Sequence, residues 1–210
     1  MKSSIRLILL ISLISLCGCV SSDRNYAPPS SKATVAPNFK EVERSRDEVW
    51  NELVAGLGAQ FFVINNMDKA SGFINVSYSG DPEKYVDGGE LYFKVENLRG
   101  PREYRFSGSK ASVQYETFRN GVLMSVFRRL SLDGRMNVIV SEPASGRTRV
   151  TVNTRYVLTL NVTGQNVMGQ PSMPHNETIS FNTGGEAKLA AGTTFKPTGE
   201  FEAAVLSVVK

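Results

Sequence analysis

A strict alternation between residues 149 and 162 constrains the fold of this chain more than any other feature of its sequence. One set of positions is apolar apart from a single threonine: Val150, Val152, Thr154, Tyr156, Leu158, Leu160 and Val162. The intervening residues are polar except for Val157. Because side chains alternate between the two faces of a strand, this segment predicts a strand with one buried and one solvated face. Such strands are typical of antiparallel sheets, since parallel sheets are covered on both faces.

Shorter strand signals, separated by turn residues, occupy much of the remaining chain. Strands are expected at 60–65 and 73–79, on either side of a turn that contains Asp, Ser and Gly. Further strands are expected at 91–95, 104–106, 111–117, 122–132, 135–140 and 177–181. The dipeptide Asp133-Gly134 predicts a turn between the segments 122–132 and 135–140.

Two helices are expected to flank these strands. Ser45 and Glu48 form a capping box, and an apolar stripe at helical spacing follows, which predicts a helix over 45–58. Near the other end, Thr198 is expected to cap a helix over 200–209. The sequence therefore predicts an α+β fold, in which an antiparallel β-sheet packs against an N-terminal and a C-terminal helix.

The first residues have the layout of an export signal. Lys2 and Arg6 precede the apolar segment 7–16, which as a helix would be roughly 15 Å long, about half of the hydrocarbon thickness of a bilayer. This length suits the hydrophobic region of a signal peptide and is too short for a transmembrane anchor. Both cysteines of the chain, Cys17 and Cys19, follow directly.

The segment Leu16-Cys17-Gly18-Cys19 resembles the lipobox of bacterial lipoproteins, in which one apolar and two small residues precede the lipidated cysteine. The resemblance implies cleavage after Gly18, a diacylglycerol thioether on Cys19, and an acyl chain such as palmitate on the new N-terminus. Several acyl chains on one residue suffice for stable anchoring, at about 0.8 kcal/mol per buried methylene. Val20 stands where an Asp would favour inner-membrane retention in enteric bacteria. The resemblance therefore implies an outer-membrane lipoprotein whose domain faces the periplasm.

Two alternative interpretations of the cysteines are a conventional signal peptide and a metal or redox pair. The metal or redox pair is the weaker alternative, because no further cysteine and only one histidine, His175, could complete a set of ligands. If Cys19 is lipidated, the folded part of the chain has no free thiol, and no cofactor is expected.

The sequence predicts three segments: a lipoprotein signal peptide over 1–18, a lipidated N-terminus with a flexible tether over 19–40, and a single domain over 41–210. The tether is expected because residues 20–40 are polar and rich in Ser and Pro. Loss of Lys2 and Arg6 with the signal peptide lowers the net charge from +4 to +2, with 22 basic residues against 20 acidic ones. This small excess, without a basic stripe, argues against a nucleic-acid partner.

One part of the chain resembles the repeated domain of BamC-type lipoproteins. The resemblance lies in Val-Trp-x-x-Leu-Val (49–54), in Phe-Phe-Val-Ile (61–64), and in Asp68 with the Ser71-Gly72 turn before an alternating strand. It implies a helix-grip domain. Those proteins are anchored by lipid at the outer membrane and are associated with the β-barrel assembly machinery. This chain departs from them in having one copy of the domain.

Residues 45–209 also resemble a family of proteobacterial lipoproteins of unassigned function, through the segments VSYSGDPEKYVD (76–87) and PTGEFE (197–202). Members of that family often have cysteines at the positions of Gly88 and Phe195. The resemblance implies that these two positions lie near each other and that a disulfide has been lost here as a pair.

The loop 80–90 is a candidate metal site. It carries carboxylates at Asp81, Glu83 and Asp87, next to glycines, and such a loop can bind Ca²⁺. The spacing is not that of an EF-hand, and a lysine lies among the carboxylates. The alternative interpretation is an ordinary acidic surface loop.

The segment 164–175 is a candidate binding loop. It contains Met168, Met173 and His175 together with Gly and Pro residues. A connection of this length is either functional or an ordinary flexible link, and the sequence leaves both interpretations open.

No Gly-x-Ser-x-Gly, Walker A or His-Glu-x-x-His motif occurs, which favours a protein that is not an enzyme. The leading hypothesis is an interaction or scaffolding module of an outer-membrane or secretion assembly, held by a lipid anchor and bound to a protein partner of the envelope. The alternative is a periplasmic carrier of a lipid or small molecule. Its cavity between helix and sheet would be lined by Phe61, Phe62, Ile74, Tyr78 and Tyr156. An envelope hydrolase is a third hypothesis, which would require two titratable groups to converge in a cleft.

Overall fold

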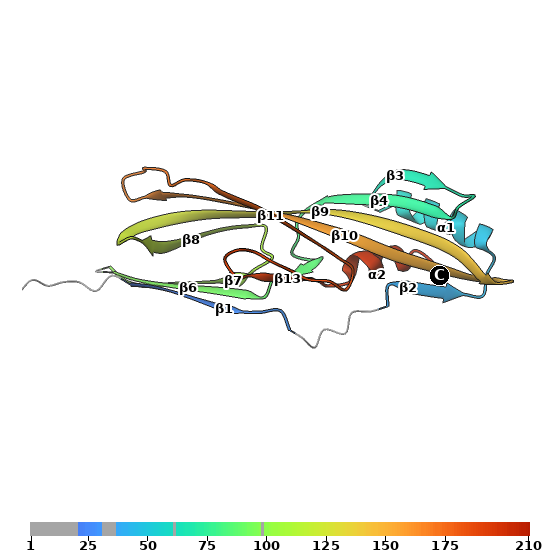
Figure 1. The fold of residues 1–210 in the computed structure, drawn as a ribbon, viewed down its shortest axis with the longest axis horizontal. Coiled ribbons are helices and arrows are strands. Elements are labelled where there is room, and N and C mark those ends of the chain that lie inside the picture. The colour runs from blue at the N-terminus through green and yellow to red at the C-terminus, as the bar shows by residue number, and fades with distance from the viewer. Residues whose placement is uncertain (1–20, 31–36, 61, 98) are drawn as a thin grey trace, which may run out of the picture.

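A long antiparallel sheet runs through the whole elongated molecule (Figure 1). The computed structural model describes residues 21–30, 37–60, 62–97 and 99–210. The strands of the long sheet are β2 (Phe39–Val42), β3 (Val63–Asp68), β4 (Phe73–Gly80), β8 (Ser112–Arg119), β9 (Val122–Ala144), β10 (Arg147–Asn166) and β11 (His175–Asn182). Their order is β11-β10-β9-β4-β3, with β2 paired to β10 and β8 paired to β9.

Two smaller sheets and two short helices complete the fold. The first small sheet has the order β1-β6-β7, formed by β1 (Ser21–Ala27), β6 (Glu90–Asn97) and β7 (Gly100–Ser107). The second has the order β12-β13-β5, formed by β12 (Ala187–Lys188), β13 (Thr194–Pro197) and β5 (Val86–Asp87). The helices are α1 (Arg46–Gly58) and α2 (Glu200–Leu206). The predicted α+β class, with antiparallel sheets and a helix near each end of the folded chain, is confirmed.

The alternating segment of β10 supplies one wall of the core. Residues 150, 152, 154, 156, 158 and 160 are buried, as predicted, and Val162 at the end of the segment is partly buried. The buried face of β9 has the same period, and its apolar residues join those of β10, α1 and α2 in one hydrophobic cluster. The two helices therefore cover the same face of the long sheet, and the opposite face carries the polar positions.

β9 is a single strand of 23 residues, so the predicted turn at Asp133-Gly134 is wrong. Gly134 pairs with Tyr78 of β4 on one side and with Tyr156 of β10 on the other. A Cβ atom at this position would lie 2.7 Å from Cε2 of Phe201 in α2. The glycine therefore marks the close approach of an aromatic ring to the strand backbone. A glycine inside a strand often marks such a close approach.

The helix termini follow the predictions in part. α1 begins with the predicted capping box, in which Ser45 accepts from the backbone N–H of Glu48 and the Glu48 carboxylate accepts from the backbone N–H of Ser45. α2 spans Glu200–Leu206 and is shorter than predicted. Its N-cap is Gly199, with a left-handed φ of 84°, and not Thr198 as predicted. The Thr198 hydroxyl, which precedes the N-cap, nevertheless accepts from the first helical N–H, of Glu200, at 3.3 Å.

Part of the predicted tether is folded. Residues 21–27 form β1, which pairs with β6 along its whole length, from Ser21 opposite Glu96 to Ala27 opposite Glu90. Residues 39–42 form β2. The tether prediction is wrong for 21–27 and for 39–40, because an edge strand is held by backbone hydrogen bonds that a polar sequence can make as well as an apolar one. Residues 31–36 lie outside the described part of the chain.

The positions of Gly88 and Phe195 are in contact, as the family resemblance implied. They lie beside the pairing of β5 with β13. A Cβ atom on Gly88 would be 2.7 Å from Cε1 of Phe195, and the Phe195 side chain is fully buried. In this chain the phenyl ring occupies the space beside the glycine.

We expect Gly134→Ala to lower the free energy of unfolding by about 1–3 kcal/mol, because the new methyl group would displace either the Phe201 ring or the strand. Urea denaturation followed by far-UV circular dichroism measures this change. Gly58→Ala is the matched control, since a Cβ there meets no atom within 4 Å and the substitution should stabilise α1 by up to about 1 kcal/mol. Unchanged stability of Gly134→Ala would contradict the close approach of ring and backbone.

Candidate functional site

A groove between the small sheet β1-β6-β7 and the long sheet is the candidate binding site. Its cavity volume is about 360 Å³. The lining includes Phe93, Tyr115, Arg128, Leu160, Val162 and His175. The walls are therefore apolar and aromatic, with a few polar groups that could orient a ligand.

Arg128 is the most unusual residue of the groove, because its side chain is only 5% exposed. Its guanidinium donates to the backbone oxygens of Gly108 at 2.5 Å and Lys110 at 3.0 Å. Burial lowers its pKa to about 10, and the nearby Tyr115 opposes this shift. No carboxylate forms an ion pair with Arg128 among the described residues. A buried guanidinium without a counter-ion is stabilised by an anionic group that binds next to it.

The sequence contains a signal for Arg128. Two adjacent arginines are typical of a solvated strand face, but Arg128 shares the phase of the buried residues Val126 and Leu130, and of the pair only Arg129 points outward. A charged residue in the buried phase of a strand is the pattern that could have identified it.

An aromatic stack joins the two sheets at the floor of the groove. The rings of Phe93 from β6 and Tyr115 from β8 stack with centroids 4.2 Å apart, and Phe106 from β7 lies 5.6 Å from Tyr115. Burial raises the pKa of Tyr115. Contacts of this kind contribute about 0.5–1.5 kcal/mol beyond the buried area and fix the small sheet against the long one.

β1 closes one side of the groove. Arg24 donates to the backbone oxygen of Ala191 at 2.8 Å and to the hydroxyl of Thr193 at 3.3 Å. The Tyr26 hydroxyl accepts from the N–H of Thr194 at 2.8 Å. These residues belong to a segment that was predicted to be a tether, so they are not among the predicted site residues.

The predicted binding loop is divided between two places. His175 begins β11 and lines the groove, where its Nε2 lies 3.3 Å from the Glu177 carboxylate. Met168 and Met173 are 81% and 87% exposed and do not line the groove. His175 and the two methionines therefore do not form one site.

The three carboxylates of the acidic loop have separate partners. Asp81 accepts from the N–H of Glu83, and Asp87 accepts from the N–H of Gly89, each at 2.8 Å. Glu83 pairs with Lys110 at 3.6 Å. Within the described ranges, no three His, Cys, Asp or Glu residues are grouped so that they could hold a metal ion. Asp81 and Asp87 thus serve separate local turns, which is a common role of such residues, and Glu83 belongs to an ion pair.

The predicted cavity between helix and sheet is occupied by the ring of Phe201. Phe61 lies outside the described residues, and the other expected lining residues belong to the core or pack against it: Phe62, Ile74, Tyr78 and Tyr156. The Phe201 ring centroid lies 5.2 Å from that of Tyr78 and 5.5 Å from that of Tyr156. These contacts fill the space that a ligand would need there, so the carrier hypothesis has no support at this location.

A buried carboxylate connects α2 to the long sheet. Glu202 is 2% exposed and accepts from the Tyr156 hydroxyl at 2.9 Å and from the Thr183 hydroxyl at 2.7 Å. Thr183 in turn accepts from the backbone N–H of Thr154 at 2.7 Å. Burial and the neighbouring Glu202 raise the pKa of Tyr156 well above its usual range. We interpret this network as structural, because each of its polar groups is hydrogen-bonded to another one inside the core.

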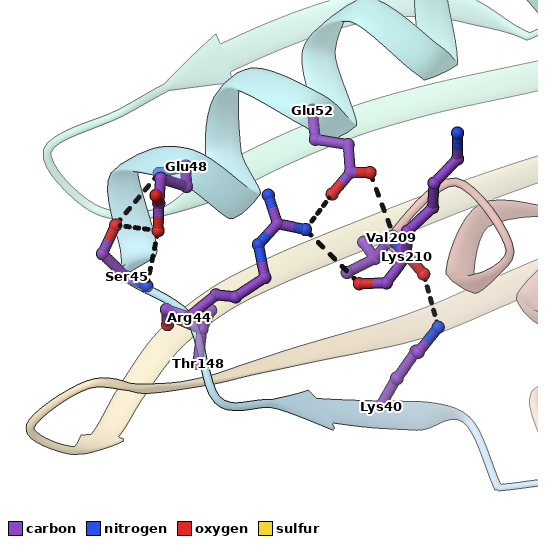
Figure 2. A network of polar contacts seen from close by, with 8 residues as sticks. All are labelled: Lys40, Arg44, Ser45, Glu48, Glu52, Thr148, Val209 and Lys210. Carbon is purple, nitrogen blue, oxygen red and sulfur yellow. Dashed lines mark hydrogen bonds and ion pairs between the residues drawn. The ribbon is translucent and has the colours of Figure 1, made fainter.

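A second polar network closes the opposite end of the helical layer (Figure 2). Arg44 donates to the Glu52 carboxylate of α1 at 2.6 Å and to the backbone oxygen of Lys210 at 3.3 Å. Lys40 of β2 donates to the backbone oxygen of Val209. The hydrogen bond from Arg44 lowers the pKa of the Glu52 carboxyl. These contacts connect β2, α1 and the C-terminal residues, and they hold the folded part of the predicted tether in place.

The comparisons with known proteins add no relative. No family model matches the sequence, and no curated protein shows significant similarity to it. In the part of the chain that the structure describes, neither helix is long and apolar enough to cross a membrane. Cys19 lies outside that part.

We expect the free energy of unfolding of Tyr156→Phe to fall less steeply with rising alkaline pH than that of the wild type. Above about pH 10 the unfolded chain releases the Tyr156 proton while the folded chain retains it, because burial raises the pKa of Tyr156, so stability falls as pH rises. Chemical denaturation between pH 8 and roughly 11.5 should show a wild-type slope steeper by up to about 1.4 kcal/mol per pH unit. The other tyrosines are common to both proteins and serve as the internal control. Parallel profiles would contradict the retention of this proton.

Proposed function

We propose that this protein is a lipid-anchored, non-enzymatic protein of the bacterial cell envelope, whose domain acts as an interaction module at the outer membrane. The lipobox-like segment that ends at Cys19 supports the anchor. The lack of a Gly-x-Ser-x-Gly, Walker A or His-Glu-x-x-His motif in the sequence supports a non-enzymatic role.

The start of β1 is the observation that carries this proposal. Backbone pairing with β6 begins at Ser21, two residues after Cys19. A lipid on Cys19 would therefore hold the domain directly at the membrane surface, without the long tether that the composition suggested. A domain held in this way suits an interaction module, because it would bind other components at a fixed distance from the bilayer.

The arrangement of the first helix supports the finer part of the fold proposal. α1 is followed by the hairpin of β3 and β4, and α1 packs beside these strands on the core face of the long sheet. This order agrees with the helix-grip, BamC-like arrangement that the residue pattern of 49–76 implied. We include that arrangement, and a protein partner in the envelope, in the proposal.

We expect Cys19→Ala to abolish incorporation of labelled palmitate and to release the protein from the outer-membrane fraction, because the lipidated residue is lost. Cys17→Ala is the matched control, since that cysteine is expected to be discarded with the signal peptide. Chemical cross-linking of the intact protein in membranes, followed by gentle solubilisation, should yield a defined heteromeric product. Labelling that persists in Cys19→Ala would refute the anchor, and recovery of uncross-linked monomer alone would refute the interaction module.

The groove beside Arg128 favours a second candidate function, the binding of an amphiphile with an anionic head. Its apolar walls would accept an acyl chain, and the buried guanidinium would favour a carboxylate or phosphate. The guanidinium already satisfies two backbone oxygens, so a ligand would use its remaining N–H groups.

We expect a dansyl-labelled undecanoic acid to bind in this groove with a blue-shifted emission, and Arg128→Met to weaken binding at least about fivefold through loss of a charge-assisted contact. Arg129→Met, which changes the exposed neighbour, should bind like the wild type. Val162→Trp would fill the groove without removing charge and provides a second test if Arg128→Met folds poorly. Equal binding by all four proteins would exclude the groove.

A further inference from the structure

Two connections meet at one end of the long sheet, and the turn between β6 and β7 lies beside them (Figure 1). They are the turn 119–122 between β8 and β9 and the loop 166–174 between β10 and β11. Strand pairing brings them together, since Met124 of β9 lies opposite Asn166 of β10. The tip is defined here as these two connections together with Arg99 of the third turn.

The tip carries the most exposed large hydrophobic side chains of the described chain. Val167, Met168 and Met173 are 74%, 81% and 87% exposed, and Val122 on the neighbouring turn is 43% exposed. Single exposed apolar residues are common on protein surfaces, but several on one projecting end indicate contact with a membrane or a partner.

The loop that presents these side chains is internally ordered. The Asn166 side-chain oxygen accepts from the backbone N–H groups of Met168 and Gln170, both at 2.9 Å, and its amide nitrogen donates to the Gln170 side chain at 2.8 Å. Gly169 adopts a left-handed φ of 78°, which a residue with a side chain rarely does. These hydrogen bonds order residues 166–170, in which the side chains of Val167 and Met168 are exposed.

The charge of the tip has one sign. Arg99 and Arg119 are exposed, and neither belongs to an ion pair within the described residues. The segments 119–122 and 166–174 contain no Asp or Glu. The nearest carboxylates on the adjoining strands have their own partners, since Glu96 pairs with Lys94 and Glu116 with Arg102. Exposed basic residues near a bilayer are attracted to anionic lipids.

The chain leaves the fold at this same end. Ser21 pairs with Glu96, next to the turn that contains Arg99, and the Ser22 hydroxyl lies 3.5 Å from that of Thr117 near the end of β8. Cys19 precedes Ser21 by two residues, and two steps between Cα atoms span at most about 8 Å. A lipid on Cys19 would therefore enter the membrane beside the tip.

We propose that the tip is a membrane-contacting surface that rests on a phospholipid bilayer, with Val167, Met168 and Met173 inserted at the boundary between headgroups and acyl chains. The inference deepens the proposed function and rests on its lipid anchor. Apolar side chains above a basic rim are the composition of interfacial membrane-binding surfaces, which bury their apolar face about 5–10 Å deep.

The tip contact also sets the orientation of the domain. β9 runs from the tip to the turn at Ser145 at the other end of the molecule (Figure 1). At about 3.3 Å per residue, a strand of this length spans roughly 70 Å. The domain therefore stands on the membrane, with its helical end held away from the bilayer.

The test uses the full, lipidated chain with one added cysteine, at Met168 or at Ser145, labelled with the fluorophore NBD. Each protein is reconstituted in vesicles of phosphatidylethanolamine and phosphatidylglycerol and floated on a density gradient. We expect Met168→Cys to give blue-shifted emission and at least about twofold quenching by lipids with a spin label on the acyl chain. The control, Ser145→Cys, should emit as in water and remain unquenched. Met173→Cys provides an independent second position on the tip.

The outcomes separate this inference from the proposed function. Failure of the proteins to float would overturn the lipid anchor and the inference together. Flotation with solvent-like emission at both Met168→Cys and Met173→Cys would overturn the inference alone. Equal quenching at the tip and at Ser145→Cys would also overturn it, because the domain would then lie flat. Shielding of the tip that persists without quenching would assign the surface to a second copy or another protein instead of lipid.

Discussion

The backbone pairing between β9 and β10 is the interaction on which the rest of the structure depends. It runs from Met124 opposite Asn166 to Ala144 opposite Arg147, with one irregularity near the turn. Every other strand of the long sheet is added to one of these two, directly or through β4. A ribbon of two strands is only marginally stable by itself. The long ribbon is therefore stabilised by different elements at its two ends, by the helices at one end and by the small sheet β1-β6-β7 at the other.

Each end of the ribbon is secured by a different kind of contact. At the helical end, the ring of Phe201 lies against Gly134, and Glu202 on the same helix is bound by Tyr156 and Thr183. One short helix thus supplies an aromatic contact and a buried carboxylate to the centre of both long strands. A helix of this length is unstable alone, so its position must come from these tertiary contacts. At the other end, the aromatic stack around Tyr115 and the bonds of Arg24 hold the small sheet.

The sequence allowed the fold class, the first helix and the buried face of β10 to be predicted, because each follows from a local periodic pattern. Gly134 could not be interpreted from its neighbours, since the reason for the glycine is Phe201, which is distant in the sequence. β1 was missed for a related reason, because its pairing with β6 needs no apolar side chains. Among the candidate site residues, the local carboxylate pattern of the acidic loop suggested a metal site, although Asp81 and Asp87 accept from backbone N–H groups of the same loop. Arg128 was recognisable only from its phase on β9.

The position of β1 determines which functions are compatible with a domain held at a membrane. A long tether would let the domain turn freely, and no surface would be fixed relative to the bilayer. Pairing that begins at Ser21 removes this freedom, so a lipid at Cys19 would fix the tip at the membrane and direct the turn at Ser145 away from it. The groove beside Arg128 then lies on the half of the molecule nearer the tip, because Leu160, Val162 and His175 belong to the tip-side parts of β10 and β11. A ligand of this groove would accordingly be met close to the bilayer, which makes an anionic amphiphile the most accessible class.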